Sequence, residues 1–296
     1  MTKAVVPVAG FGTRFLPQTK AMPKQMLPLV DKPVIQYIAE ELVGSGIETI
    51  IMVTNYHERA IEDHFDRPHH DLVENILMGG EKKRPLLDVL NEISDMANFV
   101  YVRQKGPYGN GTPLLNVQHL VGDEPFIYTW GDEFIEPTNG SPSIFEQLMT
   151  TYEEFGCSVL GSIRARTDED YKRFGFAAGE EVRPGVVDIK NIVEKPGKDK
   201  APSDLANLAG YLFTPEIFTY IGKALKNLKE GEELWYNDAL KLMLADGRRV
   251  LAKEIIDGVY RDAGTKIEYM KTVVEMGMKH PEIGAEFKKW LKSSIL

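Results

Sequence analysis

Two glycines near the start of the chain, Gly10 and Gly12, directly follow a short apolar run at residues 4–9. Such a run is typical of a buried parallel strand. Glycines at the end of a strand let the backbone turn sharply and let phosphate oxygens approach its N–H groups. The basic residues that follow are Arg14, Lys20 and Lys24. Because cations of this kind can neutralise a polyphosphate, the stretch predicts a phosphate-binding loop.

Two common nucleotide-binding motifs do not account for this loop. The Rossmann fingerprint needs Gly or Ala at the last position of G-x-G-x-x-G/A, and here that position is Phe15, which is too large for close packing of helix against strand. The P-loop needs Gly-Lys-Ser/Thr after four spacer residues, which this stretch lacks. For the two glycines taken alone, a plain tight turn with scattered surface cations is the simpler alternative.

The longer string is more specific than the glycines. G-x-G-T-R at residues 10–14 is followed by P-K-x-x-L-P at residues 23–28. This combination resembles the signature of sugar-1-phosphate nucleotidylyltransferases, and most closely that of the bacterial members that use UTP and glucose 1-phosphate. The resemblance covers nearly the whole chain. It implies transfer of a uridylyl group from UTP to glucose 1-phosphate, giving UDP-glucose and pyrophosphate, with Mg²⁺ as cofactor.

In this reaction the attacking phosphate and the triphosphate are both anions. Catalysis therefore needs positioning and charge neutralisation more than a side-chain nucleophile. Magnesium sites made of one or two carboxylates, phosphates and water suit the task. The resemblance implies that Asp132 and Asp262 bind the metal. It also implies that Arg14 and Lys24 hold the triphosphate and stabilise the departing pyrophosphate, while Lys195 binds the sugar phosphate.

The resemblance implies binding roles for other residues as well. The residues expected to contact the nucleotide are Ala9, Gly10, Gly12, Thr13, Gln25, Gln104 and Gly109. Of these, Gln104 and Gly109 lie in VRQKGPYG, which matches the segment that reads the pyrimidine base. Glu194, in VEKP, is expected to bind sugar hydroxyls beside Lys195, and Gly175 is expected to let the sugar lie against the backbone.

Each motif has a plainer interpretation when it is taken alone. Asp132, which follows a predicted strand, could cap a turn or helix, and Asp262 could cap the helix after it. Glu194 and Lys195 could be the solvated end of a strand. The functional interpretation is favoured because all the motifs occur in the family's order and approximate spacing.

The sequence also departs from the family pattern at several positions. Near the nucleotide, Gln25 replaces Glu, and Asn110 replaces the Leu of the family's G-L-G-H-A segment. Around Asp132, Trp130 replaces a small aliphatic residue and Glu133 replaces Asp. Further on, Ala209-Gly210 replace Gly-Arg and Trp235-Tyr236 replace Gln-Leu. Most of them flank the expected sugar pocket. The departures leave the activity class intact, but they leave open a different sugar 1-phosphate or dTTP in place of UTP. A non-catalytic regulatory paralogue is the alternative from another class, and the presence of Arg14, Lys24, Asp132, Lys195 and Asp262 disfavours it.

Composition excludes several other classes of protein. The net charge of −9 argues against non-specific binding of nucleic acid. No apolar stretch approaches 18 residues, so we expect no membrane span. The single cysteine, Cys157, forms no disulfide within the chain and is expected to be a buried strand residue. We therefore expect a cytoplasmic protein.

The elements that must position these residues alternate between strand and helix. Strands are expected at residues 4–9, 49–54, 99–102 and 126–130, with helices between them, including one that starts with Asp31 as N-cap and one at residues 57–65. This alternation predicts an α/β, Rossmann-like, mostly parallel mixed sheet flanked by helices. Ligands bind at the carboxyl ends of such strands, where Gly10, Gln104 and Asp132 follow.

We expect a single nucleotidyltransferase domain over residues 1–296. About residues 1–165 would form a nucleotide-binding half, and about 166–265 a sugar-phosphate-binding half with a smaller β-region. Two amphipathic helices, at 266–278 and 282–291, have apolar faces that predict contacts in a homodimer or tetramer, with packing onto the sheet as the alternative.

Overall fold

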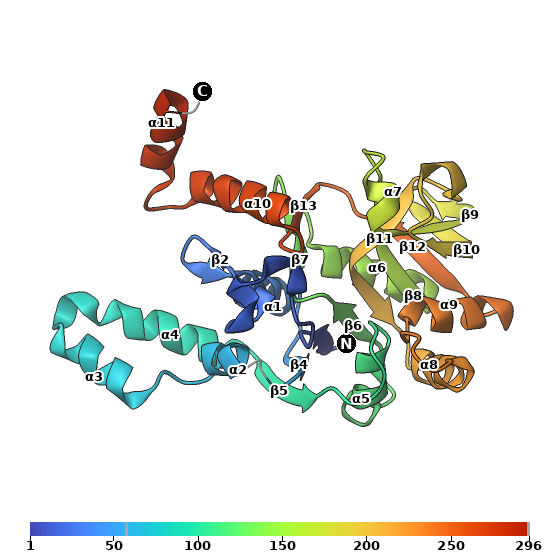
Figure 1. Ribbon diagram of the computed structural model, residues 1–296, viewed down its shortest axis with the longest axis horizontal. Helices are drawn as coiled ribbons and strands as arrows, with labels where there is room; N and C mark the ends of the chain where they lie inside the picture. Colours follow the sequence, from blue (N-terminus) through green and yellow to red (C-terminus); the bar gives the residue numbers. More distant parts are fainter. Residues whose placement is uncertain (57–58, 295–296) are drawn as a thin grey trace.

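The structure is a computed structural model that describes residues 1–56 and 59–294. Within these residues, a nine-stranded mixed sheet forms the centre of the molecule (Figure 1). Its strands, in spatial order, are β5 (Asn98–Arg103), β4 (Thr49–Thr54), β1 (Lys3–Pro7), β6 (Phe126–Thr129), β11 (Leu205–Phe213), β8 (Ser158–Arg164), β12 (Val250–Glu254), β10 (Val186–Glu194) and β9 (Gly175–Arg183). The predicted α/β mixed sheet flanked by helices is confirmed, but it is not mostly parallel, because β11, β10 and β9 add five antiparallel pairings to four parallel ones among the described residues.

The N-terminal half of the sheet is parallel and the second half is largely antiparallel. Strand β1 pairs in parallel with both β4 and β6, and β4 pairs in parallel with β5. Strand β11 runs antiparallel to β6 and β8, and β10 runs antiparallel to β12 and β9. All nine residues of β11 are buried, as expected of a strand covered on both faces.

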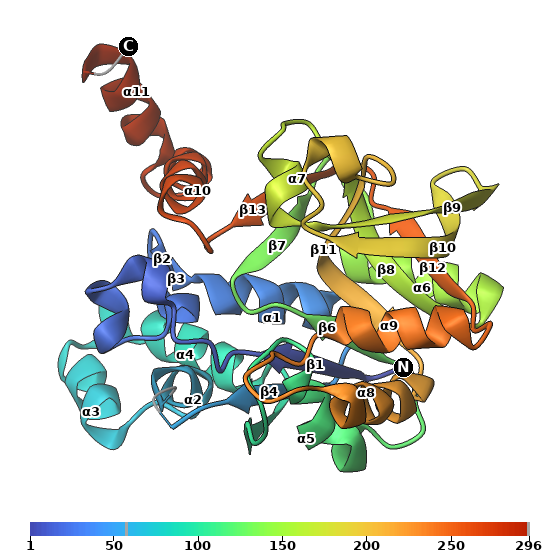
Figure 2. The same cartoon turned by 45° about the vertical axis from the view of Figure 1, so that its right-hand side comes forward.

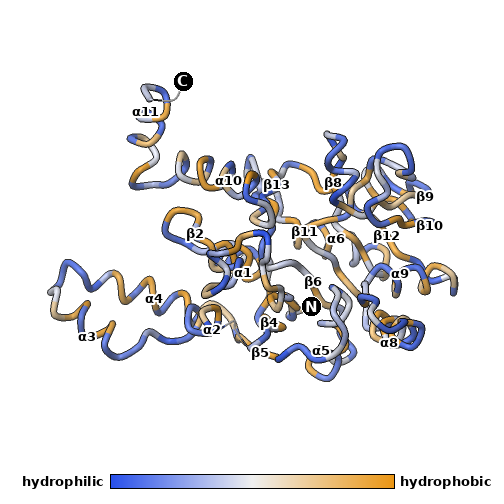
Figure 3. Tube along the Cα trace, in the orientation of Figure 1, coloured by the Kyte–Doolittle hydropathy of each residue, from blue (hydrophilic) through white to orange (hydrophobic). Residues whose placement is uncertain are grey.

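Helices cover both faces of this sheet (Figure 2). The helices α1 (Val34–Gly44) and α6 (Ile144–Phe155) pack on one face. On the other face lie α5 (Thr112–Val121), α8 (Glu216–Asn227) and α9 (Tyr236–Ala245). Figure 3 shows the hydrophobic residues concentrated along the central strands. Two apolar layers therefore hold the strand ends in place.

The start of α1 differs from the prediction. Asp31 is not its N-cap, because Lys32 and Pro33 form a short strand, β3 (Lys32–Pro33), that pairs with β2 (Pro28–Leu29). The helix begins directly after this hairpin, with Pro33 as N-cap and no side-chain hydrogen bond. The Asp31 carboxylate instead lies 3.1 Å from Nε2 of His280.

A second small sheet brings distant parts of the chain to the site. Strand β7 (Glu133–Pro137) pairs antiparallel with β13 (Gly258–Asp262), which places Asp262 directly opposite Glu133. Buried Arg261 on β13 forms ion pairs with Glu136 and Glu275. Because Glu275 belongs to α10 (Lys266–Lys279), these pairs attach that helix to the small sheet.

The remaining elements lie around the sheet. Helices α3 (His70–Met78) and α4 (Pro85–Asp95) form an arm on one side, and α11 (Gly284–Ser294) extends away beyond α10 (Figure 1). Of the helix expected at residues 57–65, residues 59–65 form α2 (Arg59–Phe65), and residues 57–58 lie outside the described residues. Cys157 is only half-buried and precedes β8. Among the described residues, no helix is long and apolar enough to cross a membrane.

Candidate active site

Two adjoining cavities open where β1, β5 and β6 end. One, of about 560 Å³, is lined by Ala9, Gly10, Lys24, Gln25, Gln104, Gly109 and neighbouring residues. The other, of about 660 Å³, is lined by Arg14, Lys24, Asp132, Gly175, Glu194, Lys195, Asp262 and neighbouring residues. Lys24 and Asp132 belong to both walls. Of the residues expected at the site, only Gly12 and Thr13 line neither cavity.

Gly12 lines neither cavity but determines the backbone conformation of the loop. Its φ of 59° lies in the left-handed region, and its carbonyl oxygen accepts a hydrogen bond of 2.7 Å from Oγ1 of Thr19. A Cβ on Gly12 would lie 3.0 Å from the Thr19 side chain and 3.1 Å from Cβ of Lys24. Gly12 therefore lets Lys24 approach the loop, and this is consistent with a turn that glycine alone adopts easily.

The two aspartates meet at the boundary of the cavities. A Cβ built on Gly264 would lie 2.8 Å from Oδ1 of Asp262 and 3.3 Å from Oδ2 of Asp132. One oxygen of each carboxylate therefore lies next to Gly264, so the two acids, 130 positions apart in the sequence, come close together there. The Gly264 N–H donates to Asp262, and Ala263 N–H donates to the carbonyl oxygen of Asp132, at 2.8 Å. These bonds fix both acids on rigid backbone.

A third carboxylate, Glu133, stands beside this pair. Burial raises the pKa of Glu133 to about 7, and the charges of Asp262 and Asp132 add to the effect. Burial also raises the pKa of Asp262, against the influence of Arg173. Like charges brought together in a half-buried site favour a cation among them.

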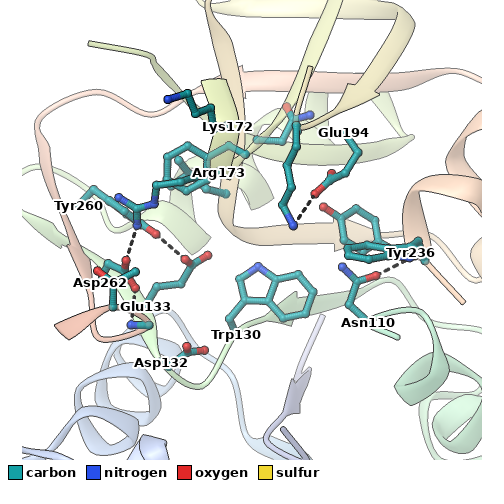
Figure 4. Close-up of a pocket in the computed structure, with 18 of the residues that line it drawn as sticks. Asn110, Trp130, Asp132, Glu133, Lys172, Arg173, Glu194, Tyr236, Tyr260 and Asp262 are labelled. Atoms are coloured by element: carbon teal, nitrogen blue, oxygen red, sulfur yellow. Dashed lines mark hydrogen bonds and ion pairs between the residues drawn. The ribbon is translucent and has the colours of Figure 1, made fainter. Parts of the chain in front are cut away.

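Two basic side chains form ion pairs with the aspartates, and Figure 4 shows the one between Arg173 and Asp262. Nζ of Lys24 lies 2.5 Å from Oδ2 of Asp132. Arg173 forms an ion pair with Asp262, and Nη1 of Arg14 donates to the carbonyl oxygen of Gly264 at 3.3 Å. Arg173 was not among the residues predicted from the sequence. Its position two residues before Gly175 was the only available signal.

The donor set suits Mg²⁺ bound together with a nucleotide. Asp132 and Asp262 offer hard oxygen ligands, and glycine at position 264 places no side chain against the nearest oxygen of each. In the described part of the chain, no group of three His, Cys, Asp or Glu side chains is arranged to hold a metal ion. Two carboxylates can hold a divalent cation that takes its remaining ligands from phosphates and water.

The far end of the larger cavity contains the residues expected to bind the sugar. Nδ2 of Asn237 donates to Oε2 of Glu194 at 2.7 Å. A Cβ on Gly175 would lie 2.9 Å from the same oxygen, so a larger residue here would require the Glu194 carboxylate to shift. Nζ of Lys195 lies 3.6 Å from Oε1 of Glu194 and 5.2 Å from the ring centroid of Trp235. The Glu194 carboxylate (Figure 4) and the Lys195 cation thus line one cavity, and buried Asn237 supports the carboxylate from behind.

Aromatic side chains between the two ends were not predicted as site residues. Trp130 lines both cavities and lies 5.9 Å, centroid to centroid, from the ring of Tyr236. The hydroxyl groups of Tyr211 and Tyr236 are 2.9 Å apart and buried, so they satisfy each other. The departures at positions 130, 235 and 236 therefore form one connected aromatic wall.

Two further departures have a local physical reason. Nε2 of buried Gln25 donates to the carbonyl oxygen of Val8 at 3.2 Å, which an ionised Glu at this position could not do. Glu133 accepts a hydrogen bond of 2.9 Å from the N–H of Ala209 and another from the hydroxyl of Tyr260. Ala209 has a φ of 62°, and the bond from Glu133 helps to hold this unfavourable conformation.

Comparisons with known proteins agree with this geometry. The nucleotidyl transferase family profile matches residues 3–277. The chain is 40% identical over 290 residues to a UTP–glucose-1-phosphate uridylyltransferase of Staphylococcus epidermidis, covering 98% of this chain and 97% of that protein. It is 37% identical over 295 residues to the uridylyltransferase YngB of Bacillus subtilis, with 99% and 95% covered.

Solved structures give the same result. A UTP-bound UGPase from Acinetobacter baumannii superposes with a TM-score of 0.85 at 30% identity, over the whole of both chains. A UDP-glucose pyrophosphorylase complexed with UDP-glucose gives 0.82 at 33% identity, over 95% of this chain and 100% of that one. The resemblance inferred from the sequence motifs is confirmed, and the chain belongs to the nucleotidyl transferase family.

Proposed function

We propose that the protein transfers the uridylyl group of UTP to glucose 1-phosphate and releases pyrophosphate, with Mg²⁺ as cofactor. The observation that carries this proposal is the pair of neighbouring carboxylates, Asp132 and Asp262, at the boundary between the two cavities. The names of the relatives support the choice of UTP and glucose 1-phosphate.

In the proposed reaction, a phosphate oxygen of glucose 1-phosphate attacks the α-phosphorus of UTP. A new P–O bond forms, the bond between the α- and β-phosphates breaks, and pyrophosphate leaves with that electron pair. The Gly10 loop and Gln104 bind the nucleotide, while Arg14 and Lys24 lie where they can neutralise its phosphates. Mg²⁺, held by Asp132 and Asp262, would supply further neutralisation of phosphate charge.

The sugar phosphate would occupy the larger cavity. Glu194, held by the amide of Asn237, offers an acceptor for sugar hydroxyls, and Gly175 lets the sugar approach the backbone. Lys195 is placed to bind the phosphate, and the Lys24 and Arg173 cations lie nearer the acids. Holding both substrates in line turns a bimolecular reaction into a reaction within one complex.

The test is a pyrophosphate-release assay on the purified protein with a panel of nucleotides and sugar 1-phosphates. We expect the highest kcat/KM with UTP and glucose 1-phosphate, and no release after removal of divalent cations. A preference for dTTP or for another hexose 1-phosphate would change the assigned substrate but would still support nucleotidyl transfer as the reaction. Inactivity with every pair would favour a non-catalytic paralogue and refute the proposal.

We also propose a cytoplasmic, homo-oligomeric protein. The single cysteine suits a reducing compartment, and α10 and α11 carry exposed apolar side chains suited to a contact between copies. These side chains are Ile267, Met270 and Trp290, and exposed Ile283 lies between the two helices. Light scattering coupled to gel filtration tests the oligomer, and a monomeric mass at micromolar concentration would contradict it.

A further inference from the structure

The loop expected to read the base is bound directly to the segment that begins α9. The N–H of Leu234 donates to the carbonyl oxygen of Tyr108, and the N–H of Gly111 donates to the carbonyl oxygen of Leu234, both at 2.8 Å. Between them, a Cβ on Gly109 would lie 2.1 Å from the carbonyl oxygen of Leu234. The two backbones are therefore in contact. Tyr108 and Gly109 of the loop line the smaller cavity, and Trp235 and Tyr236 at the start of α9 line the larger one.

Asn110 makes the only side-chain hydrogen bond between these two segments among the described residues. Its Oδ1 accepts from the N–H of Tyr236 at 3.1 Å, and its carbonyl oxygen accepts from the hydroxyl of Tyr128 at 2.6 Å. Tyr236 is the first residue of α9, and the N-cap of that helix, Trp235, makes no capping hydrogen bond with its own side chain. Asn110 thus satisfies a free N–H at the helix start from another part of the chain.

The first turn of α9 carries residues of the sugar pocket. Asn237 donates to Glu194, and the hydroxyl of Tyr236 lies 2.9 Å from that of Tyr211. A shift of this turn would therefore move the partner of Glu194 and one member of the aromatic wall together. Asn110 lines both cavities, so a ligand in either one lies beside the same side chain.

We propose that Asn110 is a positioning residue that couples the base-reading loop to the sugar pocket. The inference rests on the proposed function, and extends it to a residue at which the sequence departs from the family motif. The Leu of that motif has no atom that could accept the hydrogen bond of Tyr236. Through this bond, Asn110 holds the start of α9 in the orientation in which Asn237 presents Glu194 to the sugar.

The experiment compares Asn110→Ala, which removes the acceptor, with Asn110→Asp, which keeps it and places a negative charge suited to a helix N-terminus. At saturating UTP, we expect Asn110→Ala to raise the KM for glucose 1-phosphate about three- to tenfold, the effect of one lost hydrogen bond. Its kcat and its KM for UTP should change less. Asn110→Asp keeps the acceptor but adds a negative charge beside two anionic substrates, so its KM for glucose 1-phosphate and its KM for UTP should rise by similar factors, whereas Asn110→Ala should raise mainly the first.

Asn116→Ala is the matched control. Asn116 supports the same loop through two hydrogen bonds of 3.0 Å with the backbone of Lys105, and within the part of the chain that the structure describes it forms no hydrogen bond with α9. We expect this variant to affect the KM for UTP more than that for glucose 1-phosphate. An equal rise in the KM for glucose 1-phosphate in both Ala variants would show general damage to the loop and overturn the proposal.

Calorimetry gives a second readout that needs no turnover. Asn110→Ala should weaken the binding of UDP-glucose more than that of UDP, whereas Asn116→Ala should weaken both alike. An unchanged ratio of the two affinities in Asn110→Ala, or a change of this ratio in Asn110→Asp equal to that in Asn110→Ala, would overturn the proposal. A wild-type protein that binds both ligands without releasing pyrophosphate would refute the proposed function and leave the coupling intact.

Discussion

The replacement Gly264→Ala tests the metal site without removing a ligand. The new Cβ would lie 2.8 Å from Oδ1 of Asp262 and 3.3 Å from Oδ2 of Asp132. The φ of Gly264 lies outside the left-handed region, so alanine is compatible with the backbone. The substitution therefore places one methyl group next to an oxygen of each carboxylate and changes no charge.

The size of the effect follows from this geometry. Carbon and oxygen atoms rarely approach closer than about 3.4 Å, so the Asp262 carboxylate must move by roughly half an ångström. A displacement of about 1 Å at a reacting centre lowers the rate about a hundredfold. We therefore expect kcat to fall about ten- to a hundredfold, or about 1.4–2.7 kcal/mol in the activation free energy. The Mg²⁺ concentration for half-maximal activity should rise as well.

The assay is pyrophosphate release over a range of Mg²⁺ concentrations, with the melting temperature as a check on folding. Gly222→Ala is the control, because a Cβ on this α8 residue would meet no atom within 4 Å. It should keep full activity and stabilise the helix by up to about 1 kcal/mol. A folded Gly264→Ala protein with wild-type kcat and wild-type Mg²⁺ dependence would refute the assignment of the two aspartates.

Three further substitutions test other parts of the account. Lys195→Ala should raise the KM for glucose 1-phosphate at least about tenfold through loss of a charge-assisted bond, and an unchanged KM would remove Lys195 from the site. Gly109→Ala, whose Cβ would clash with the backbone of Leu234 at a φ of 124°, should raise the KM for UTP; wild-type saturation by UTP would contradict this. Burial raises the pKa of Glu41 to about 8, so its proton stabilises the native state at low pH, and this contribution falls as the pH rises from about 4.5 to about 8. In urea denaturation, the free energy of unfolding of Glu41→Gln should therefore rise relative to that of the wild type over this range, by at most about 1.4 kcal/mol per pH unit. Unfolding free energies of the two proteins that change in parallel with pH would contradict the raised pKa of Glu41.

Local patterns in the sequence were sufficient to predict much of the fold. Runs of β-branched residues such as residues 49–54 identify strands, and glycines after a strand identify a loop that approaches a ligand. Because the carboxyl ends of parallel strands meet at one edge, Gly10, Gln104 and Asp132 could be expected to lie together. The cavities bring these residues together at that edge.

Pairings between distant segments could not be predicted in this way. The contact of Arg173 with Asp262 and that of Asn110 with Tyr236 depend on how β13 and α9 are placed, and no local period encodes this placement. The predicted start of α1 was wrong for a related reason. Asp31 has the side chain of an N-cap, but the pairing of β2 with β3 moved the helix start past it.

The most direct test of the central claim is the position of a divalent cation in crystals grown with UDP-glucose and Mn²⁺. The account predicts an anomalous peak at about 2.1 Å from a carboxylate oxygen of Asp132 and from one of Asp262. Crystals with UDP-glucose in the cleft and no ion between these two residues, or an ion bound by neither, would contradict it.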